Sequence, residues 1–293
     1  MKVCFIGTVE FSKNALIQLI SLDVDLCGVV SNTKNKLNSD FANLKSVCEA
    51  NNVDFYDTND INSAATIKWI ANRKPDILFC FGWSQLIKTE LLKLSPMGVV
   101  GFHPSFLPQN RGRHPIIWAL ALGLEKTGST FFFMDEGADS GDILSQKEVP
   151  IYYRDNAKSL YERISATASE QIKEFIPALT SNTHQRLKQN HELANSWRKR
   201  GEIDGQIDFR MSSRAIYNLV RALTRPYIGA HIVFEQENIQ IWDVKEIAYE
   251  FKNIEPGKVL EMDGKNILVK TYDGAISIVE HEFNTLPKVG EYL

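Results

Sequence analysis

Residues 97 to 115 hold the pattern from which the fold can be read. They run Met97-Gly98-Val99-Val100-Gly101-Phe102-His103-Pro104-Ser105-Phe106-Leu107-Pro108-Gln109-Asn110-Arg111-Gly112-Arg113-His114-Pro115. The apolar residues up to Val100 are typical of the end of a buried strand, and Ile116 to Leu124 has helical spacing. The prolines and glycines between them predict a tight, irregular crossing. Because open α/β sheets bind ligands at the carboxyl ends of their strands, a site is expected here.

Short apolar runs alternate with helical patterns on both sides of this crossing. The expected strands are residues 2–7, 26–31, 76–81, 127–135 and 143–151, and the expected helices are 13–22, 41–51, 60–72 and 155–179. This alternation predicts an α/β fold, a Rossmann-like and mostly parallel sheet with helices on both faces. The turn after Gly7 is not Gly-x-Gly-x-x-Gly, so a dinucleotide fingerprint is absent.

The pattern changes in the last third of the chain. Residues 181–195 are polar with little periodicity, residues 212–223 read as one helix, and short strands follow. We therefore expect a catalytic domain over residues 1–180, a linker over 181–210 and a small β-rich C-terminal domain over 211–293.

Composition excludes several classes of protein. The chain has 293 residues, a formal net charge of -3 and a pI near 6.1, so bulk charge gives no support to a nucleic-acid partner. The four cysteines lie far apart without a Cys-x-x-Cys pair, which favours reduced thiols over a metal site or disulfides. No apolar run reaches membrane-spanning length and no signal-peptide pattern is present, so a cytoplasmic protein is expected.

A second stretch, Met134 to Asp142, follows an expected strand and contains Asp139-Ser140-Gly141. Together, the two stretches resemble the 10-formyltetrahydrofolate-dependent formyltransferases, a family of methionyl-tRNA, glycinamide ribonucleotide and sugar N-formyltransferases. The family motifs Asn-x-His, Ser-Leu-Leu-Pro, Arg-Gly and Asp-small-Gly correspond to His103, Ser105–Pro108, Arg111-Gly112 and Asp139–Gly141. One position departs, since the family Asn falls on Gly101. The resemblance implies an N-formyltransferase that uses 10-formyltetrahydrofolate and no metal, with an OB-like C-terminal domain.

The resemblance implies that His103 and Asp139 are the catalytic residues. Formyl transfer to an amine needs a group that takes up the amine proton or donates to the carbonyl oxygen, and a histidine with a pKa near 6.5 can do either. A neighbouring carboxylate holds the imidazole ring and favours its charged form. Gly101 lacks the family's amide donor. A backbone N–H, Gln85, Asn110 or His114 could replace it, or the activity has decayed or shifted to another acyl donor.

The resemblance also implies which residues bind the folate and the second substrate. For the folate these are Phe81, Gly82, Trp83, Ile87 and Asp139, although Trp83 taken alone could equally be a core residue. For the second substrate they are Ser105, Arg111 and Arg113. Two guanidinium groups before a helix start suit a diphosphate, and either arginine alone could be a salt bridge instead.

The resemblance leaves the acceptor substrate to be chosen. The loop Thr33 to Phe41 is short and weakly charged, unlike the basic loop of the tRNA enzymes, and Trp197 to Phe209 resembles a run of the sugar enzymes. We expect a nucleotide-linked amino sugar of surface-polysaccharide biosynthesis as substrate. A methionyl-tRNA formyltransferase and a non-catalytic nucleotide-sugar-binding homologue are the alternatives. A homodimer is left open.

Overall fold

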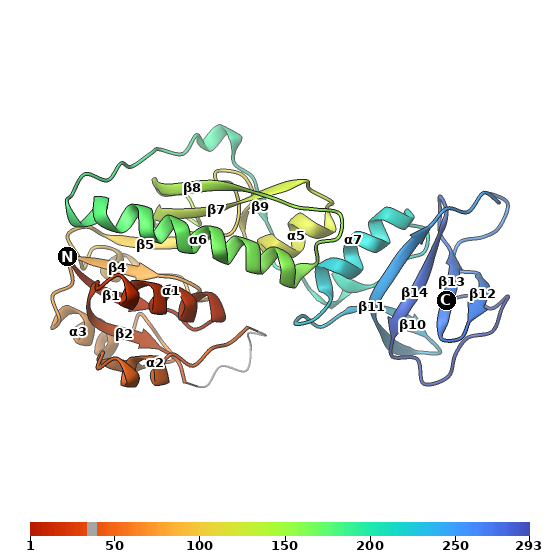
Figure 1. Ribbon diagram of the computed structural model, residues 1–293, viewed down its shortest axis with the longest axis horizontal. Coiled ribbons are helices and arrows are strands. Elements are labelled where there is room, and N and C mark those ends of the chain that lie inside the picture. Colours follow the sequence, from red (N-terminus) through yellow and green to blue (C-terminus); the bar gives the residue numbers. More distant parts are fainter. Residues whose placement is uncertain (34–39) are drawn as a thin grey trace. The chain divides into compact units, whose positions relative to one another are not determined.

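The computed structural model of the protein describes residues 1–33 and 40–293 (Figure 1). Residues 34–39 lie outside the described residues. They make up most of the loop Thr33 to Phe41, whose weak charge is the sequence argument against a tRNA substrate. The chain forms two compact units. The first contains residues 1–112, 127–149 and 162–196, and the second contains 113–126, 150–161 and 197–293.

A seven-stranded sheet is the centre of the first unit, with strand order β3-β2-β1-β4-β5-β7-β8. Its strands are β1 (Lys2–Ile6), β2 (Asp25–Ser31), β3 (Phe55–Asp57), β4 (Ile77–Cys80), β5 (Val99–His103), β7 (Lys126–Phe133) and β8 (Ile143–Pro150). Its helices are α1 (Glu10–Ser21), α2 (Lys45–Ala50), α3 (Ala64–Ala71), α4 (Thr89–Leu92) and α6 (Ala157–Thr180). The first five strands pair in parallel and β7 pairs antiparallel to β5, which confirms the predicted α/β fold with a mostly parallel sheet.

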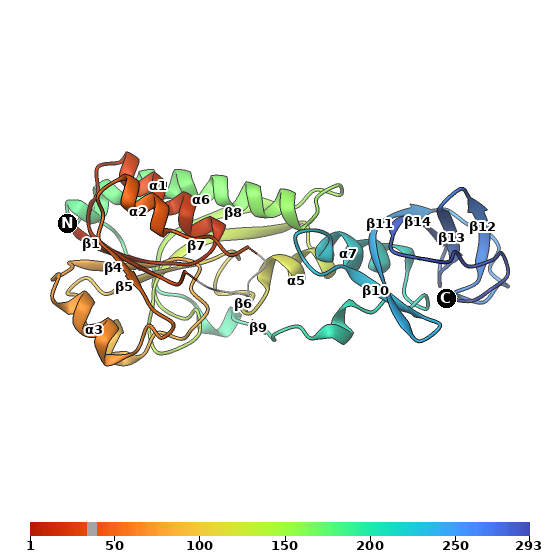
Figure 2. The ribbon, with the colours of Figure 1, turned by 90° about the horizontal axis from the view of Figure 1, so that it is seen from below.

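The two faces of this sheet have different cores, because successive side chains of a strand point to opposite faces. On one face, Phe79 and Phe131 pack against Phe175 of α6. On the other face, Cys4 and Leu78 belong to a cluster of buried aliphatic residues and thiols with Ile70 of α3. Figure 2 shows α1 and α6 on one side of the sheet and α3 on the other.

The predicted elements differ from the observed ones mainly at their ends. Strand β5 continues three residues beyond Val100, through His103, because it pairs with β4 on one side and with β7 on the other. The short elements β3 and α4 were not predicted, since three or four residues are too few to show a period. Helix α2 begins at Lys45 and not near Phe41.

The second unit combines two helices with a five-stranded antiparallel sheet in the order β10-β11-β14-β13-β12. The helices α5 (Pro115–Ala121) and α7 (Ser213–Leu223) pack against each other. The strands are β10 (Ala230–Phe234), β11 (Glu237–Ile247), β12 (Val259–Asp263), β13 (Asn266–Lys270) and β14 (Ala275–His281). This sheet confirms the predicted β-rich C-terminal domain.

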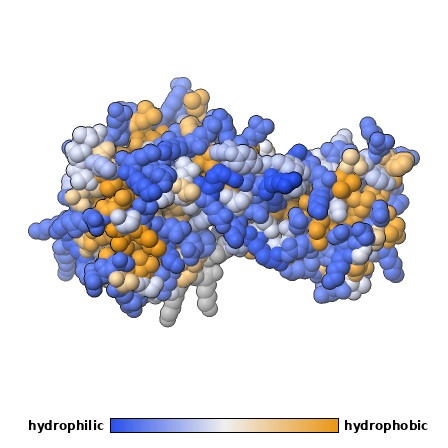
Figure 3. Space-filling view, viewed as in Figure 1, coloured by the Kyte–Doolittle hydropathy of each residue, from blue (hydrophilic) through white to orange (hydrophobic). Residues whose placement is uncertain are grey.

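The segment expected as a linker contains short regular elements. They are the 3-10 turn His191–Leu193, the two-residue strand β9 (Ser196–Trp197) and the 3-10 turn Glu202–Gly205, and β6 (Arg111–Gly112) is a similar short strand in the crossing. Hydrophilic residues cover most of the face of each unit seen in Figure 3, with apolar residues in separate patches. Among the described residues, no helix is long and apolar enough to cross a membrane.

Candidate active site

His103 and Asp139 lie close together in the first unit. His103 ends β5, and Asp139 lies in the loop after the neighbouring strand β7. The Asp139 Oδ2 atom lies 3.6 Å from His103 Nδ1. His103 is buried, and Asp139 keeps 22% of its side-chain surface exposed. The pair is therefore partly shielded from water, and Asp139 is its more exposed member.

The loop after β7 brings Asp139 to His103 by folding back along the sheet. Because β7 is antiparallel to β5, its last residue, Phe133, pairs with Val100, three positions before His103. The loop is closed tightly, since Asp135 Oδ1 accepts from the Gly137 N–H at 3.0 Å and from Ser140 Oγ at 2.6 Å. Asp139 therefore reaches His103 through the loop that follows an antiparallel strand of the sheet.

Hydrogen bonds determine which nitrogen of His103 carries a proton. Nε2 lies 2.8 Å from the carbonyl oxygen of Asn110, which can only accept, so Nε2–H is the donor. In the neutral ring, the lone pair of Nδ1 then faces the Asp139 carboxylate. A proton carried by Nδ1 would lie beside the Asp139 Oδ2 atom, 3.6 Å away.

A buried side chain that sequence reasoning missed holds the Asp139 loop. Gln189 donates from Nε2 to the carbonyls of Asp139, at 2.9 Å, and Gly141, at 2.7 Å. Its Oε1 accepts from Arg111 Nη2 at 2.6 Å. Nothing in the sequence pointed to it, because it stands alone in the polar run expected as a linker.

Four residues predicted to bind ligands have their side chains inside the protein instead. Phe81 is fully buried in the aromatic core, and Ile87 belongs to the aliphatic cluster. Ser105 Oγ donates to the Gln109 carbonyl at 3.0 Å, and Arg111 is committed to Gln189. These side chains therefore shape the loops around the site, and the contacts predicted for these four residues with a ligand stay a prediction.

Trp83 has an intermediate position between the two predicted roles. Its ring is partly buried and packs on the aliphatic cluster, while its Nε1 atom is buried without a hydrogen-bond partner in the structure. Gly82 before it has φ +71°, and a Cβ there would come within 2.3 Å of Val9 Cγ2, so only glycine fits this turn. Trp83 therefore combines a packed ring with a buried indole N–H that has no partner in the structure.

Neighbouring side chains fill the space that the family's asparagine side chain would need at position 101. A Cβ at Gly101 would lie 2.9 Å from Met134 Cγ and 3.2 Å from Phe132 Cε1. Of the proposed substitute donors, Gln85 is already engaged, because Nε2 donates to the Asn59 carbonyl and Oε1 accepts from Ile61 N–H. Asn110, next to His103, remains the candidate in the first unit.

Arg113 belongs to the second unit, where cations gather around His114. Burial, and then the positive charges of Arg200, Arg113 and Lys199, lower the pKa of His114. Arg113 and Lys199 are exposed. Arg200, in contrast, is buried and donates to the Asp204 carbonyl.

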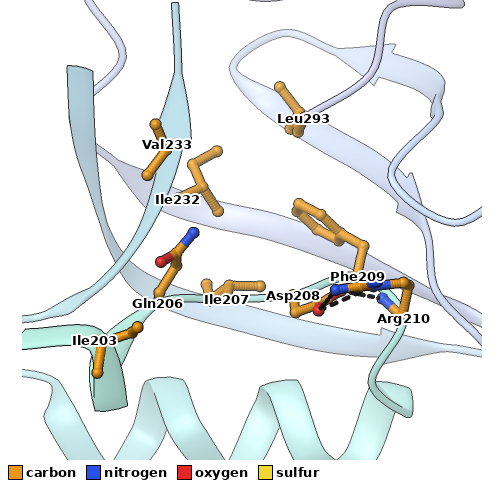
Figure 4. Close-up of a pocket in the computed structure, with 9 residues that line it drawn as sticks. All are labelled: Ile203, Gln206, Ile207, Asp208, Phe209, Arg210, Ile232, Val233 and Leu293. Carbon is orange, nitrogen blue, oxygen red and sulfur yellow. Dashed lines mark hydrogen bonds and ion pairs between the residues drawn. The ribbon is translucent and has the colours of Figure 1, made fainter. Parts of the chain in front are cut away.

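A pocket of about 470 Å³ lies elsewhere in the second unit (Figure 4). Six of its nine lining residues are apolar, with Phe209 and Ile232 among them. Its charged residues, Asp208 and Arg210, are bonded to each other. The pocket therefore offers no unpaired charge to a phosphate. Among the residues described, no group of three His, Cys, Asp or Glu side chains is arranged to hold a metal ion.

Comparison with known proteins identifies the family. Residues 1–176 match the formyl transferase family and residues 201–289 the formyl transferase C-terminal domain. The methionyl-tRNA formyltransferase of Alkaliphilus oremlandii is 29% identical over 296 residues, which cover 99% of this chain and 94% of that protein.

Two solved structures share the fold over nearly the whole chain. WlaRD, a sugar 3N-formyl transferase, gives a TM-score of 0.73 at 20% identity, covering 98% of this chain and 99% of that one. The N-formyltransferase from Helicobacter canadensis gives 0.71 at 18% identity, covering 95% and 98%. Since the family match spans more than half of its residues, this chain belongs to the formyl transferase family and is a formyltransferase.

Proposed function

We propose that this protein transfers the formyl group of 10-formyltetrahydrofolate to the amine of a nucleotide-linked amino sugar. The observation that carries the proposal is the His103–Asp139 pair, which has a ring nitrogen facing a carboxylate at 3.6 Å in a largely buried setting. Both residues stand at the family's motif positions. The pair supports an acyl transfer in which a proton leaves an amine.

His103 would accept the proton that the attacking amine loses. Nδ1 is the basic atom, because Nε2–H is engaged with the Asn110 carbonyl. Asp139 would hold the ring and stabilise the imidazolium that forms, and general-base help of this kind contributes about 10²–10⁴-fold. The amine nitrogen would form a bond to the formyl carbon of the bound folate while the bond from that carbon to N10 breaks. The proton taken by His103 would pass to N10, so that tetrahydrofolate leaves.

The indole of Trp83 supports a folate site on the same face of the sheet. Trp83 and Met134 pack on the cluster that includes Val99, and the period of two sends Gly101 and His103 to that face as well. The partly buried aromatic ring offers a flat apolar surface against which a folate ring can stack. The structure of WlaRD is in the presence of 5-N-formyl-THF and dTDP, and the Helicobacter canadensis structure contains folinic acid.

The cations around His114 support a diphosphate on the acceptor substrate. Arg113 and Lys199 are exposed in the same neighbourhood as Arg200. The Helicobacter canadensis enzyme is in complex with dTDP-3-aminofucose, a nucleotide diphosphate sugar with a free amine.

We expect Arg113→Ala to weaken binding of the sugar nucleotide by at least about tenfold, since charged hydrogen bonds contribute about 1.5–3 kcal/mol. Isothermal calorimetry measures the affinity of the variant for the sugar nucleotide, and its affinity for the folate should not change.

The test is a panel of UDP-, dTDP- and GDP-linked 3-amino and 4-amino sugars, each incubated with 10-formyltetrahydrofolate. The expected result is an N-formylated sugar nucleotide, detected by mass spectrometry, with an equal amount of tetrahydrofolate. His103→Ala is the control for uncatalysed transfer. Formylation of no sugar nucleotide, together with formylation of methionyl-tRNA, would overturn the proposal.

Methionyl-tRNA is the second candidate acceptor, because a methionyl-tRNA formyltransferase is similar to this chain along almost its full length. The charge of the second unit argues against it. Its residues 113–126, 150–161 and 197–293 hold 17 Lys and Arg and 17 Asp and Glu, so the unit has no excess of positive charge. RNA backbone binding depends on many cations, so affinity for tRNA at physiological salt should be low.

A further inference from the structure

We propose that Gln189 is the positioning residue that directs the Asp139 carboxylate at His103, with Arg111 as its anchor. The inference rests on the proposed function in one respect, which is that His103 and Asp139 act as the catalytic pair. Gln189 stands 50 residues after Asp139, beyond helix α6, and belongs to the same compact unit.

Both N–H bonds of the Gln189 amide are used on the Asp139 loop. They reach the carbonyl oxygens of Asp139 at 2.9 Å and Gly141 at 2.7 Å, the residues on either side of Ser140. Gln189 is only 6% exposed, so water does not compete for these bonds. Two fixed carbonyls determine the direction in which the loop presents its side chains.

The other end of the amide is fixed by Arg111. Arg111 Nη2 donates to Gln189 Oε1 at 2.6 Å, so a donor faces the amide oxygen and two acceptors face its nitrogen. The amide therefore has one satisfied orientation. Arg111 is itself held, because its backbone N–H donates to the Asn195 carbonyl and Nη2 lies 3.1 Å from His191 Nδ1.

The residue after Arg111 completes the arrangement. The Gly112 N–H donates to Asp139 Oδ2 at 2.9 Å, and this is the same oxygen that faces His103. Arg111 thus anchors the loop through Gln189, while Gly112 anchors the carboxylate directly. The short strand β6 therefore holds the Asp139 backbone through Arg111 and Gln189, and the Asp139 side chain through Gly112.

Asp139 needs such support because its backbone is in a sparsely populated conformation. Its φ of +53° lies in the left-handed region, which aspartate tolerates better than most residues with a Cβ but adopts only in a minority of cases. Strained residues persist only where the surroundings over-determine them. Without the amide of Gln189, the loop can relax, and a displacement of about 1 Å at a catalytic group can cost about 10²-fold in rate.

The kinetic test compares Gln189 with a matched control, Gln171. Gln171 is also a buried glutamine with three hydrogen bonds, to the Ser129 carbonyl, Ser129 Oγ and Ser145 Oγ, and none of these partners is in the Asp139 loop. Gln189→Met should lower kcat by about 10- to 100-fold and leave both KM values within about twofold. Gln171→Met should leave kcat unchanged.

A third variant separates the two ends of the amide. Gln189→Glu keeps an acceptor for Arg111 and loses both donors to the loop. It should therefore lower kcat as Gln189→Met does. If Gln189→Glu keeps the turnover of the unmodified protein, the donors to the loop are not required and the inference is wrong.

A substrate-free measurement keeps the inference separate from the proposed function. Hydrogen exchange of the Gly112 amide, followed by NMR, reports whether the carboxylate is in place. Exchange should be about tenfold faster in Gln189→Met and unchanged in Gln171→Met, and unchanged protection in Gln189→Met would overturn the inference. Normal turnover of Asp139→Asn would instead overturn the catalytic pair, while the Gly112 result would still show whether Gln189 positions the carboxylate.

Discussion

His103 and Asp139 can work as a pair only while each is held by groups that do not take part in the reaction. The Asn110 carbonyl fixes the protonated nitrogen of the ring, and the Gly112 N–H fixes one oxygen of the carboxylate. Neither partner could be predicted from residue type, because both contacts are made by backbone atoms. The sequence could therefore predict which side chains meet and not how they are oriented.

Substitution of either member of the pair should stop catalysis without unfolding the protein. His103→Ala removes the proton acceptor, and Asp139→Asn keeps an oxygen for the Gly112 N–H but removes the charge. We expect each to lower turnover by at least about 10²-fold. The measurement is turnover together with a thermal melt, and near-normal turnover in either folded variant would contradict the proposed mechanism.

Gly101 poses a different question, since the family's amide donor has no space there. Gly101→Asn forces Met134 to move, and overpacking of this kind costs about 1–3 kcal/mol. We expect lower stability and no gain in turnover, also when Met134→Ala is added to make room. A gain above about tenfold in the double variant would mean that the native site lacks its donor to the carbonyl oxygen.

Asn110 is the residue that we expect to supply the missing donor. It has φ +62°, a conformation that asparagine and aspartate tolerate, so Asn110→Asp preserves the backbone while removing the amide N–H. Loss of one such donor costs about 10²–10³-fold in kcat. A kcat within about threefold of the unmodified protein would show that another group fills this role.

At the level of elements, the sequence predicted most of the first unit because its signals are long or strongly periodic. The buried runs of β1, β4 and β7 and the length of α6 could all be read in advance. The antiparallel direction of β7 could not, because a buried strand has the same pattern in either direction. The position of Asp139 depends on the direction of β7, so this position could not be predicted from the sequence.

Strands β1 and β2 also bring together two cysteines that are distant in the sequence. The register shifts between Val3 and Cys4, and Cys27 lies opposite this irregularity. A hydrogen bond with the Cys27 thiol, followed by burial, raises the pKa of Cys4, and the same bond lowers that of Cys27. Burial raises the pKa of Cys48 to about 11 and of Cys80 to about 12.

We therefore expect N-ethylmaleimide at pH 7.5 to label Cys27 before the other three cysteines. The thiolate is the reacting form, and Cys27 alone combines a lowered pKa with partial exposure. Peptide mapping by mass spectrometry after short reaction times measures the order. Equally fast labelling of Cys48 or Cys80 in the folded protein would contradict the assignment.

On the scale of the whole molecule, the second unit is not simply the C-terminal part of the chain. It includes residues 113–126 and 150–161, which lie within the catalytic domain expected over residues 1–180. Helix α5 packs on α7, and Arg221 of α7 donates to the carbonyls of Tyr152 and Asp155. Such contacts between distant segments leave no signal in a single sequence.

A chain that ends at residue 180 should therefore be unstable. It would lack α7 and expose Ile116, Ile117 and Leu120 of α5, which are buried in the full chain. Each exposed side chain of this kind costs about 1.5–3 kcal/mol, while a domain's total stability is only about 5–15 kcal/mol. We expect aggregation, or a Tm more than about 10 °C below that of the full chain. A monodisperse fragment 1–180 that melts within about 3 °C of the full chain would show that the catalytic domain ends there, as the sequence predicted.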